Sequence, residues 1–366
     1  MIELLKKNKY IVALVLWQLV SVYLMAVGVW PTWIAWINVG LLAASIAALS
    51  PFDALRVFVV SIPFYVVVPN NYADTLSMWR LLIIWLFIVV SIKQLRTARF
   101  QLHLKHLKST FLPWDWWLLS FGVILLLSMF VAKYPVESAK QIIFLGNAAL
   151  LYIVVRVVIL TKENIRASIV ATASSLGIIV AFGYLQYIST FFSSQYYFWQ
   201  YWATRVSSLY YGQSLADVLA YSNSWFSTSV GGSSLRMFSI MPDSHSFAMV
   251  AALFIGFVLS IIYFRKQESK SNGWLWFLVV TGALAIMFAG TRGVWVGMLA
   301  PLVIAPILYF KRVARSAVAL NCKVYGIILL LFVLSPLMSQ GIGLVRSAAS
   351  GSFLDRATSV DRKSVV

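Results

Sequence analysis

Long blocks of apolar residues recur along the whole chain, and this feature most restricts what the chain can fold into. Polar or basic stretches separate the blocks, as expected when helices cross about 30 Å of hydrocarbon at about 1.5 Å per residue. Hydrophobic residues make up 61% of the sequence and charged residues 11%, whereas soluble domains are on average nearer half apolar and a quarter charged. The sequence therefore predicts an all-α, polytopic integral membrane protein.

The hydropathy pattern predicts about eleven transmembrane helices. Their ranges are 11–29, 32–49, 55–68, 78–92, 112–131, 142–160, 167–192, 246–264, 274–290, 293–310 and 324–338. We expect them to form one transmembrane domain over residues 1–340, with a long aromatic outer loop at 193–244. Residues 341–366 would begin an extracytoplasmic loop or tail.

Lysine and arginine are distributed unevenly between the predicted loops. The chain has 29 of them against 11 acidic residues, which gives a formal charge of +18. If the N-terminus is cytoplasmic, most of these cations fall in the inside loops, as the positive-inside bias requires. We therefore expect a cytoplasmic N-terminus and an extracytoplasmic C-terminal tail. The basic charge is then explained by topology and membrane lipids, and no nucleic-acid partner is expected.

Several kinds of chemistry are excluded by residues that the sequence lacks. Cys322 is the single cysteine, so an internal disulfide, a cysteine-based zinc site and an iron–sulfur cluster are excluded. The sequence has neither a Walker motif nor a dinucleotide-binding fingerprint. No cluster of carboxylates on the outer side suggests a metal. Any chemistry must use arginine, lysine, histidine or carboxylates, and we expect neither a cofactor nor a metal ion.

Six basic residues outside the tail oppose the positive-inside bias. They are Arg80, Lys133, Lys140, Arg205, Arg236 and Arg292. Several lie at or near the starts of spans that run inward from the outer side, where a cation faces the positive end of the helix dipole. This placement is favourable if an anion is shared between the side chain and the N–H groups of the first helical turn. The alternative is that these long side chains reach lipid phosphates at the interface.

Arg292 lies in a tight turn between two predicted spans, in the sequence Gly290-Thr291-Arg292-Gly293. We expect the Thr291 hydroxyl to cap the second helix and the glycines to allow close helix packing. The turn would hold the planar guanidinium at the membrane surface, where its fork of donors suits phosphate oxygens.

A second candidate segment joins the outer loop to the eighth predicted span. Arg236 comes first, and Pro242 breaks the incoming chain. Asp243 or Ser244 is expected to cap the helix, which places His245 in the first turn, within reach of Asp243. An Asp–His pair beside arginines is the best general-base candidate in the chain. The alternative is a histidine that only lies at the interface.

The outer loop at 193–244 is rich in aromatic residues and has few charges. Loops of this length are uncommon unless they are functional. Amphipathic aromatic rings are suited to stacking on sugars, and we take Trp199, Trp202 and Trp225 as candidate sugar-binding residues. An aromatic belt at the level of the lipid headgroups is the alternative.

At these residues the chain resembles the O-antigen ligase/polymerase family of bacterial envelope proteins. Thr291-Arg292-Gly293 looks like the family's Ser-Arg-Gly turn, which opens a span after a hydrophobic helix. Arg236 followed by Pro242-Asp243 is similar to a second family element, an arginine before a Pro-Asn pair, with aspartate in place of asparagine. The match covers residues 232–310. The resemblance implies a multi-pass protein of the bacterial cytoplasmic (inner) membrane.

The resemblance also implies an activity. Such a protein would be a metal-independent glycosyltransferase that moves a glycan from undecaprenyl diphosphate to an acceptor glycan or glycolipid, as a ligase or a polymerase. Arg236, Arg292 and Arg356 would bind the diphosphate. His245, with Asp243, would accept the proton of the acceptor hydroxyl.

The C-terminal part departs from the family pattern. Family ligases carry a large outer domain with a further arginine and a histidine after the Ser-Arg-Gly helix and another span. Here the tail begins after Met338, and no histidine follows Arg292. We therefore expect the chain to be a fragment; in the alternative, His245 takes the role of that histidine.

Two other functions stay open. A transporter, such as a flippase of lipid-linked saccharides or a carrier of another anion, would place charges and broken helices near the middle of the membrane. Only Arg156 lies well inside a predicted span, toward its cytoplasmic end. A non-enzymatic membrane scaffold would tolerate replacement of the outer arginines.

Overall fold

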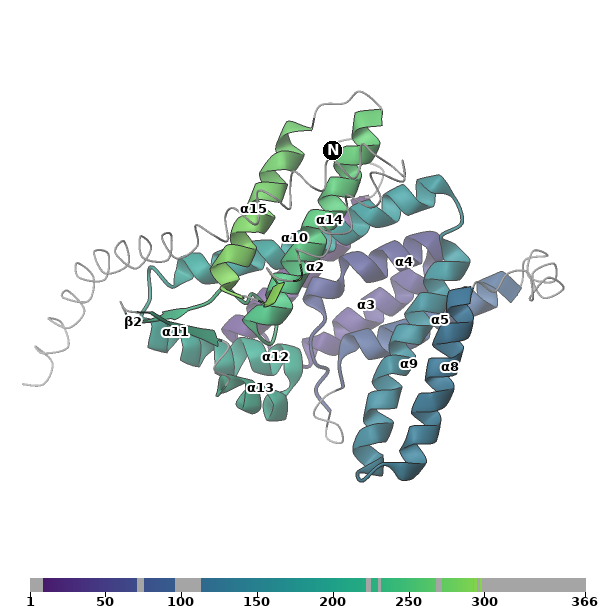
Figure 1. The fold of residues 1–366 in the computed structure, drawn as a ribbon, viewed down its shortest axis with the longest axis horizontal. Coiled ribbons are helices and arrows are strands. Elements are labelled where there is room, and N and C mark those ends of the chain that lie inside the picture. The colour runs from purple at the N-terminus through teal and green to yellow at the C-terminus, as the bar shows by residue number, and fades with distance from the viewer. Residues whose placement is uncertain are drawn as a thin grey trace, which may run out of the picture. The chain divides into compact units, whose positions relative to one another are not determined.

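The structure is a computed structural model, and it describes residues 9–70, 76–95, 113–221, 225–229, 232–267, 272–291, 293, 294 and 297 (Figure 1). These residues are mainly helical, with one short antiparallel hairpin. The chain divides into two compact units. The first comprises Met1–Met25 and Trp30–Ser168, and the second comprises Ala26–Val29 and Ile169–Val366.

Five of the described helices are long and apolar enough to cross a membrane. They are α2 (Lys9–Val27), α5 (Met78–Leu95), α9 (Pro135–Val158), α10 (Lys162–Ser189) and α14 (Ser244–Gln267). Shorter apolar helices are α3 (Ile34–Ala48), α8 (Pro113–Ser128) and α15 (Gly273–Ala289). These helices support the prediction of a helical membrane protein. The total of about eleven spans is not confirmed, and the predicted spans at 293–310 and 324–338 lie almost wholly outside the described residues.

The prediction of a helical span at 55–68 is wrong, because the chain leaves the α-helix there. α4 (Pro51–Val60) is followed by the short 3-10 helix η1 (Ile62–Phe64). Pro63 has no N–H to donate and disfavours helical geometry at the residue before it, so the α-helix cannot continue.

The extended segment after η1 pairs with the residues before α5. Val68 N donates to Leu76 O at 2.7 Å, and Met78 N donates to Val66 O at 3.0 Å. Val66, Val68 and Met78 are completely buried. Non-helical backbone in a membrane protein must find its hydrogen bonds within the protein, and this pairing provides two of them.

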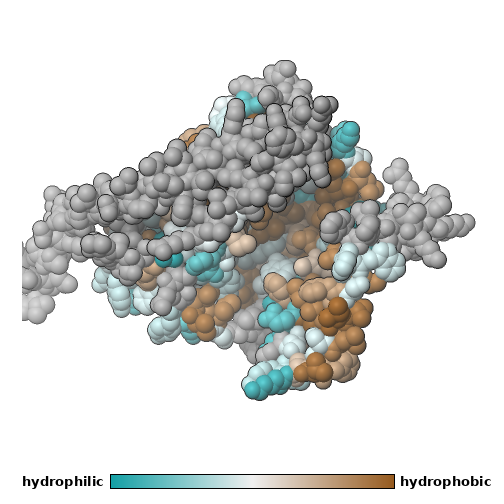
Figure 2. Space-filling model, in the orientation of Figure 1, coloured by the Kyte–Doolittle hydropathy of each residue, from teal (hydrophilic) through white to brown (hydrophobic). Residues whose placement is uncertain are grey.

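In the first unit, α8 and α9 form a hairpin through the 3-10 helix η2 (Met129–Val131) and expose apolar side chains along their length (Figures 1 and 2). Such a surface suits contact with lipid tails. Arg156 Nη2 lies 3.2 Å from Asp115 Oδ2, and the Tyr152 hydroxyl also donates to Asp115. The ion pair compensates the charge of Arg156, the cation predicted to lie well inside a span.

The core of the second unit is built from α10, α14 and α15. Glycines let these helices approach closely. A Cβ atom on Gly282 of α15 would lie 2.8 Å from Ile255 Cγ1 of α14, and a Cβ atom on Gly183 of α10 would lie 2.7 Å from Phe247 Cζ. Small residues at such positions are a common means of tight packing between membrane helices.

The segment at 193–244, which we expected to be a long outer loop, is largely folded. It contains α11 (Gln195–Tyr201), the π-helix η3 (Trp202–Ser207), α12 (Ser208–Tyr211), α13 (Gln213–Ala220), and the hairpin strands β1 (Phe226–Ser229) and β2 (Gly232–Leu235). Its first residues follow α10 and the turn after that helix, and its last residues lead into α14.

Arg205 of η3 lies against the C-terminal end of α2. A Cβ atom on Gly28 would lie only 2.7 Å from Arg205 Nη1, and the Tyr201 hydroxyl donates to Ala26 O at 2.9 Å. A cation is favourable beside the last carbonyls of a helix. This contact gives a structural reason for the position of Arg205, one of the cations that the predicted topology places on the outer side.

We expect Gly282→Val to destabilise the second unit, because the new side chain would overlap Ile255. Overpacking of a buried contact costs about 1 to 3 kcal/mol and lowers the thermal unfolding midpoint. The matched control is Gly256→Val, since apart from its chain neighbours and the nearby backbone of its own helix no described atom lies within 4 Å of a Cβ position on Gly256 of α14. Thermal unfolding of the detergent-solubilised protein measures both variants. Equal midpoints would contradict the tight contact between α14 and α15.

Candidate functional site

The segment from Arg236 to Asp243 joins β2 to α14 without regular secondary structure, yet much of it is buried. Met237, Phe238 and Ser239 are completely buried. The N–H and C=O groups of such a segment cannot reach water, so they need partners inside the protein. The elements that supply these hydrogen-bond partners therefore hold the segment in place.

Gln186 of α10 supplies partners for three consecutive peptide groups of this segment. Its Oε1 accepts hydrogen bonds from Phe238 N at 2.9 Å and Ser239 N at 2.6 Å, and its Nε2 donates to Arg236 O at 3.4 Å. The side chain of Gln186 is itself 1% exposed. One buried amide therefore fixes the backbone immediately after Arg236.

Ser239 marks the tightest point of the segment. Its φ of 58° lies in the left-handed region, which is uncommon for a residue with a side chain. Its hydroxyl donates to Ile179 O of α10 at 2.6 Å, and Met237 N donates to Phe288 O of α15 at 3.1 Å. These bonds tie the segment to two helices and hold Ser239 in its strained conformation.

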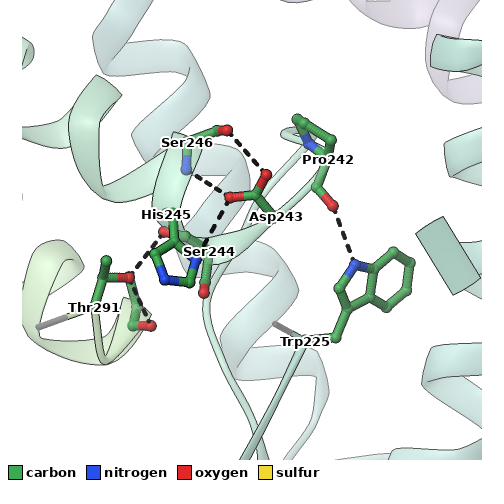
Figure 3. Close-up of polar contacts among 8 residues, drawn as sticks. Trp225, Pro242, Asp243, Ser244, His245, Ser246 and Thr291 are labelled. Carbon is green, nitrogen blue, oxygen red and sulfur yellow. Dashed lines mark hydrogen bonds and ion pairs between the residues drawn. The ribbon is translucent and has the colours of Figure 1, made fainter. Parts of the chain in front are cut away.

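Asp243 caps α14. The sequence had predicted either Asp243 or Ser244 in this role. Its Oδ1 accepts the N–H of Ser246 at 2.7 Å, and its Oδ2 accepts the Ser246 hydroxyl at 3.0 Å (Figure 3). Phe247 N donates to Asp243 O at 3.2 Å, which is the first bond of the helix. Both carboxylate oxygens are therefore engaged by the start of α14.

His245 lies in the first turn of α14, and its side chain is 59% exposed. Its Nδ1 is 3.8 Å from Asp243 Oδ1, on the side of the carboxylate that Figure 3 shows facing the imidazole. This separation exceeds a hydrogen bond, so Asp243 does not orient the ring as the carboxylate of a catalytic triad would. The imidazole remains open to a reacting group outside the protein.

Arg236 packs against the end of α15. Its backbone N donates to Trp225 O at 2.8 Å, and its side chain runs toward Gly290. A Cβ atom on Gly290 would lie 3.7 Å from Arg236 Nε and 3.9 Å from Arg236 Cδ. Gly290 is the left-handed residue that ends α15, with a φ of 63°. The structure thus brings Arg236 to the turn that precedes Arg292.

Thr291 joins the end of α15 to the start of α14. It is 1% exposed, and its hydroxyl lies 3.2 Å from Ser244 O and 3.3 Å from Ala289 O (Figure 3). A hydroxyl facing two carbonyls acts as a donor. We expected this hydroxyl to cap the following helix. In the structure it bonds instead to the first residue of α14 and to the last residue of α15.

The three tryptophans predicted to bind sugar belong to a packed aromatic cluster. Trp225 is 0% exposed, stacks on Phe238 at 4.5 Å between ring centroids, and donates from Nε1 to Pro242 O at 3.1 Å. Its ring is therefore not accessible to a sugar in this structure. Trp202 and Trp199 are partly buried; Trp202 lies edge-on to Phe238, and Trp199 donates from Nε1 to Ala220 O at 3.2 Å.

Tyr211 adds a further bond to the same segment. Its hydroxyl donates to Ile240 O at 2.7 Å. Burial raises the pKa of Tyr211 above its ordinary value, and the neighbouring Tyr210 and Asp243 add to the rise. The phenol therefore keeps its proton and acts as a donor at physiological pH.

Arg236 and Asp243 lie at the two ends of this segment and His245 follows in the first turn of α14, whereas Arg292 and Arg356 lie outside the described residues. Gln186 is a residue of this site that was not predicted from the sequence. A glutamine inside the apolar run at 167–192 was the available signal, because polar residues within membrane helices are rare and usually have a specific partner.

Comparison of the chain with protein-family models, curated proteins and solved structures finds no match.

We expect Gln186→Leu to loosen the segment between Arg236 and Asp243. The substitution leaves the N–H groups of Phe238 and Ser239 without their acceptor. Each buried N–H without a partner costs about 1 to 3 kcal/mol of folding stability. Hydrogen–deuterium exchange of peptides covering the segment should become faster, and the unfolding midpoint should fall.

The control is Gln213→Leu, since Gln213 is exposed and its Nε2 donates to Asp217 at 2.7 Å. Unchanged exchange in Gln186→Leu would show that the amide does not hold this backbone.

Proposed function

We propose that the chain is a membrane glycosyltransferase that moves a glycan from undecaprenyl diphosphate to an acceptor glycan or glycolipid at the outer face of the bacterial cytoplasmic membrane. The observation that carries the proposal is the approach of the Arg236 side chain to Gly290, where an added Cβ atom would lie 3.7 Å from Arg236 Nε. These residues come from segments far apart in the sequence. Arg292 follows Gly290 by two positions, so the chain itself keeps the second arginine near the same turn.

Two arginines at one turn suit a diphosphate leaving group. Negative charge develops on the diphosphate as the glycosidic bond breaks, and preorganised cations in a partly water-excluded place stabilise that charge. The guanidinium group offers a planar fork of donors that matches phosphate oxygens. Because the donor is already activated, the reaction needs no nucleotide.

The start of α14 contributes less to anion binding than its dipole alone would suggest. Asp243 occupies the cap and brings a negative charge to this end of the helix. An anion near this turn must therefore be held mainly by the arginines. In the proposal, Asp243 acts as a positioning residue that fixes the first turn on which His245 is carried.

His245 is the proposed general base. Its exposed imidazole lies in the first turn of α14, immediately after the segment that begins with Arg236. It would take the proton from the acceptor hydroxyl as that oxygen attacks the sugar carbon, while the carbon–oxygen bond to the diphosphate breaks. The leaving diphosphate then keeps the electron pair of that bond.

A carrier of lipid-linked saccharides or of another anion is the second candidate. The observation that favours it is the interruption after α4, where buried extended backbone takes the place of a continuous helix. Broken helices of this kind line substrate sites in many transporters. A carrier moves the glycan across the membrane while the glycan stays on its lipid, so an assay that detects the new glycosidic bond separates the two functions.

We expect Arg236→Ala to lower the rate of glycan transfer about 10² to 10³-fold, the usual effect of removing one donor that stabilises developing negative charge. Arg236→Lys should keep part of the rate, since the charge remains but the fork is lost. The assay uses proteoliposomes, a labelled undecaprenyl diphosphate-linked glycan and an acceptor glycolipid, at matched protein abundance. Lys133→Ala, which removes an exposed cation of the first unit, is the control and should retain the full rate.

We expect His245→Ala to lower the same rate about 10² to 10⁴-fold, as for loss of a general base. The substitution removes an exposed side chain, so the unfolding midpoint should stay unchanged. Full transfer in both Arg236→Ala and Arg292→Ala would refute the proposed function, and full transfer in His245→Ala would assign the base to another residue.

A further inference from the structure

The start of α5, in the first unit, carries two buried polar groups that the described residues leave without a hydrogen-bond partner. Ser77 immediately precedes the helix and is 9% exposed, and its Oγ is buried. Arg80 lies in the first turn, and its Nε is buried as well. Buried polar groups in proteins are nearly always hydrogen-bonded, so two such groups within one helical turn point to a missing partner.

The charge at this place indicates what that partner is. Arg80 stands at the positive end of a helix dipole, where a cation is unfavourable unless an anion binds between the side chain and the helix. Among the described residues of the first unit, the carboxylates of Asp53 and Asp115 form ion pairs with Arg56 and Arg156. None of the described ion pairs involves Arg80.

The backbone around the two groups is held firmly. Residues Val67 and Ser77 form a β-bridge, and Arg80 N donates to Ser77 O at 3.1 Å. The adjacent Trp79 packs edge-on against Phe144 of α9, with 5.6 Å between ring centroids. Ser77 and Arg80 are therefore presented by a preformed turn.

A second cation, Lys140, lies near the start of α9, the helix that packs against α5. Lys140 lies one turn before Phe144 on α9, and its side chain is exposed. It adds to the positive potential that would attract an anion to the start of α5. Interfacial snorkelling by Arg80 was the alternative from the sequence. It supplies no acceptor for Nε, which is buried even though Arg80 as a whole is only partly buried.

We propose that Ser77, Arg80 and the first turn of α5 bind a phosphate group. The Ser77 hydroxyl and the guanidinium N–H groups donate to phosphate oxygens, and the helix dipole adds a favourable field. The phosphate comes either from the headgroup of a membrane lipid or from free inorganic phosphate. The site lies in the first unit and does not depend on the proposed glycan transfer, whose residues lie in the second unit.

The test is a binding measurement on the delipidated full chain in detergent. The probes are a short-chain phosphatidic acid, the diacylglycerol with the same tails, and inorganic phosphate, each titrated by calorimetry. The wild type should bind phosphatidic acid more tightly than diacylglycerol. If inorganic phosphate binds and competes, the site takes the free ion; if it does not, the site takes the lipid headgroup. Both outcomes support a phosphate site.

Three variants connect the binding to the proposed residues. Arg80→Gln should weaken phosphate binding about tenfold or more, because it removes charge-assisted hydrogen bonds. Arg80→Lys should bind with intermediate affinity, since it keeps the charge without the fork. Ser77→Ala should weaken binding about threefold to tenfold, the usual value of one hydrogen bond, and keeps the cation and the shape of the turn.

Lys133→Gln is the matched control, since Lys133 is an exposed cation of the same unit, and it should bind within about twofold of the wild type. The proposal is overturned if the wild type binds phosphatidic acid and diacylglycerol equally. It is also overturned if Ser77→Ala and a folded Arg80→Gln, judged by its unfolding midpoint, both bind as the wild type does.

Discussion

One buried amide holds the part of the chain on which the candidate site depends. A stretch of backbone without regular structure is costly inside an apolar protein, because each unpaired N–H or C=O loses its bonds to water and gains nothing in return. Gln186 removes that cost at three successive peptide groups. This stretch begins at Arg236, packs against Trp225 and ends at the cap of α14. Its position therefore affects how all three are placed.

The helical nature of the chain could be predicted because composition and block length alone determine it. The interruption after α4 was also visible in the sequence, since Pro63 lies inside the predicted span, but hydropathy averaging hides a single proline. Asp243 was correctly predicted as one of two alternatives for the cap of α14, because capping is a local interaction between neighbouring residues.

Whether the aromatic residues are exposed or buried could not be predicted in the same way. Trp225 has a large apolar surface and one donor, and those properties suit a sugar platform and a protein core equally well. Only the tertiary partners decide between them, here Phe238 and the Pro242 carbonyl. The approach of Arg236 to Gly290 is likewise a contact between residues far apart in sequence, which no local pattern encodes.

The contact of Arg205 and Tyr201 with the end of α2 has a consequence for how the protein is made. The Tyr201 hydroxyl bonds to a carbonyl 175 positions earlier in the chain. At ordinary rates of translation, roughly 10 to 35 s pass between synthesis of the two ends of that bond. During that time the carbonyl of Ala26 lacks its Tyr201 partner. The end of α2 is thus synthesised early, and its bond to Tyr201 can form only much later.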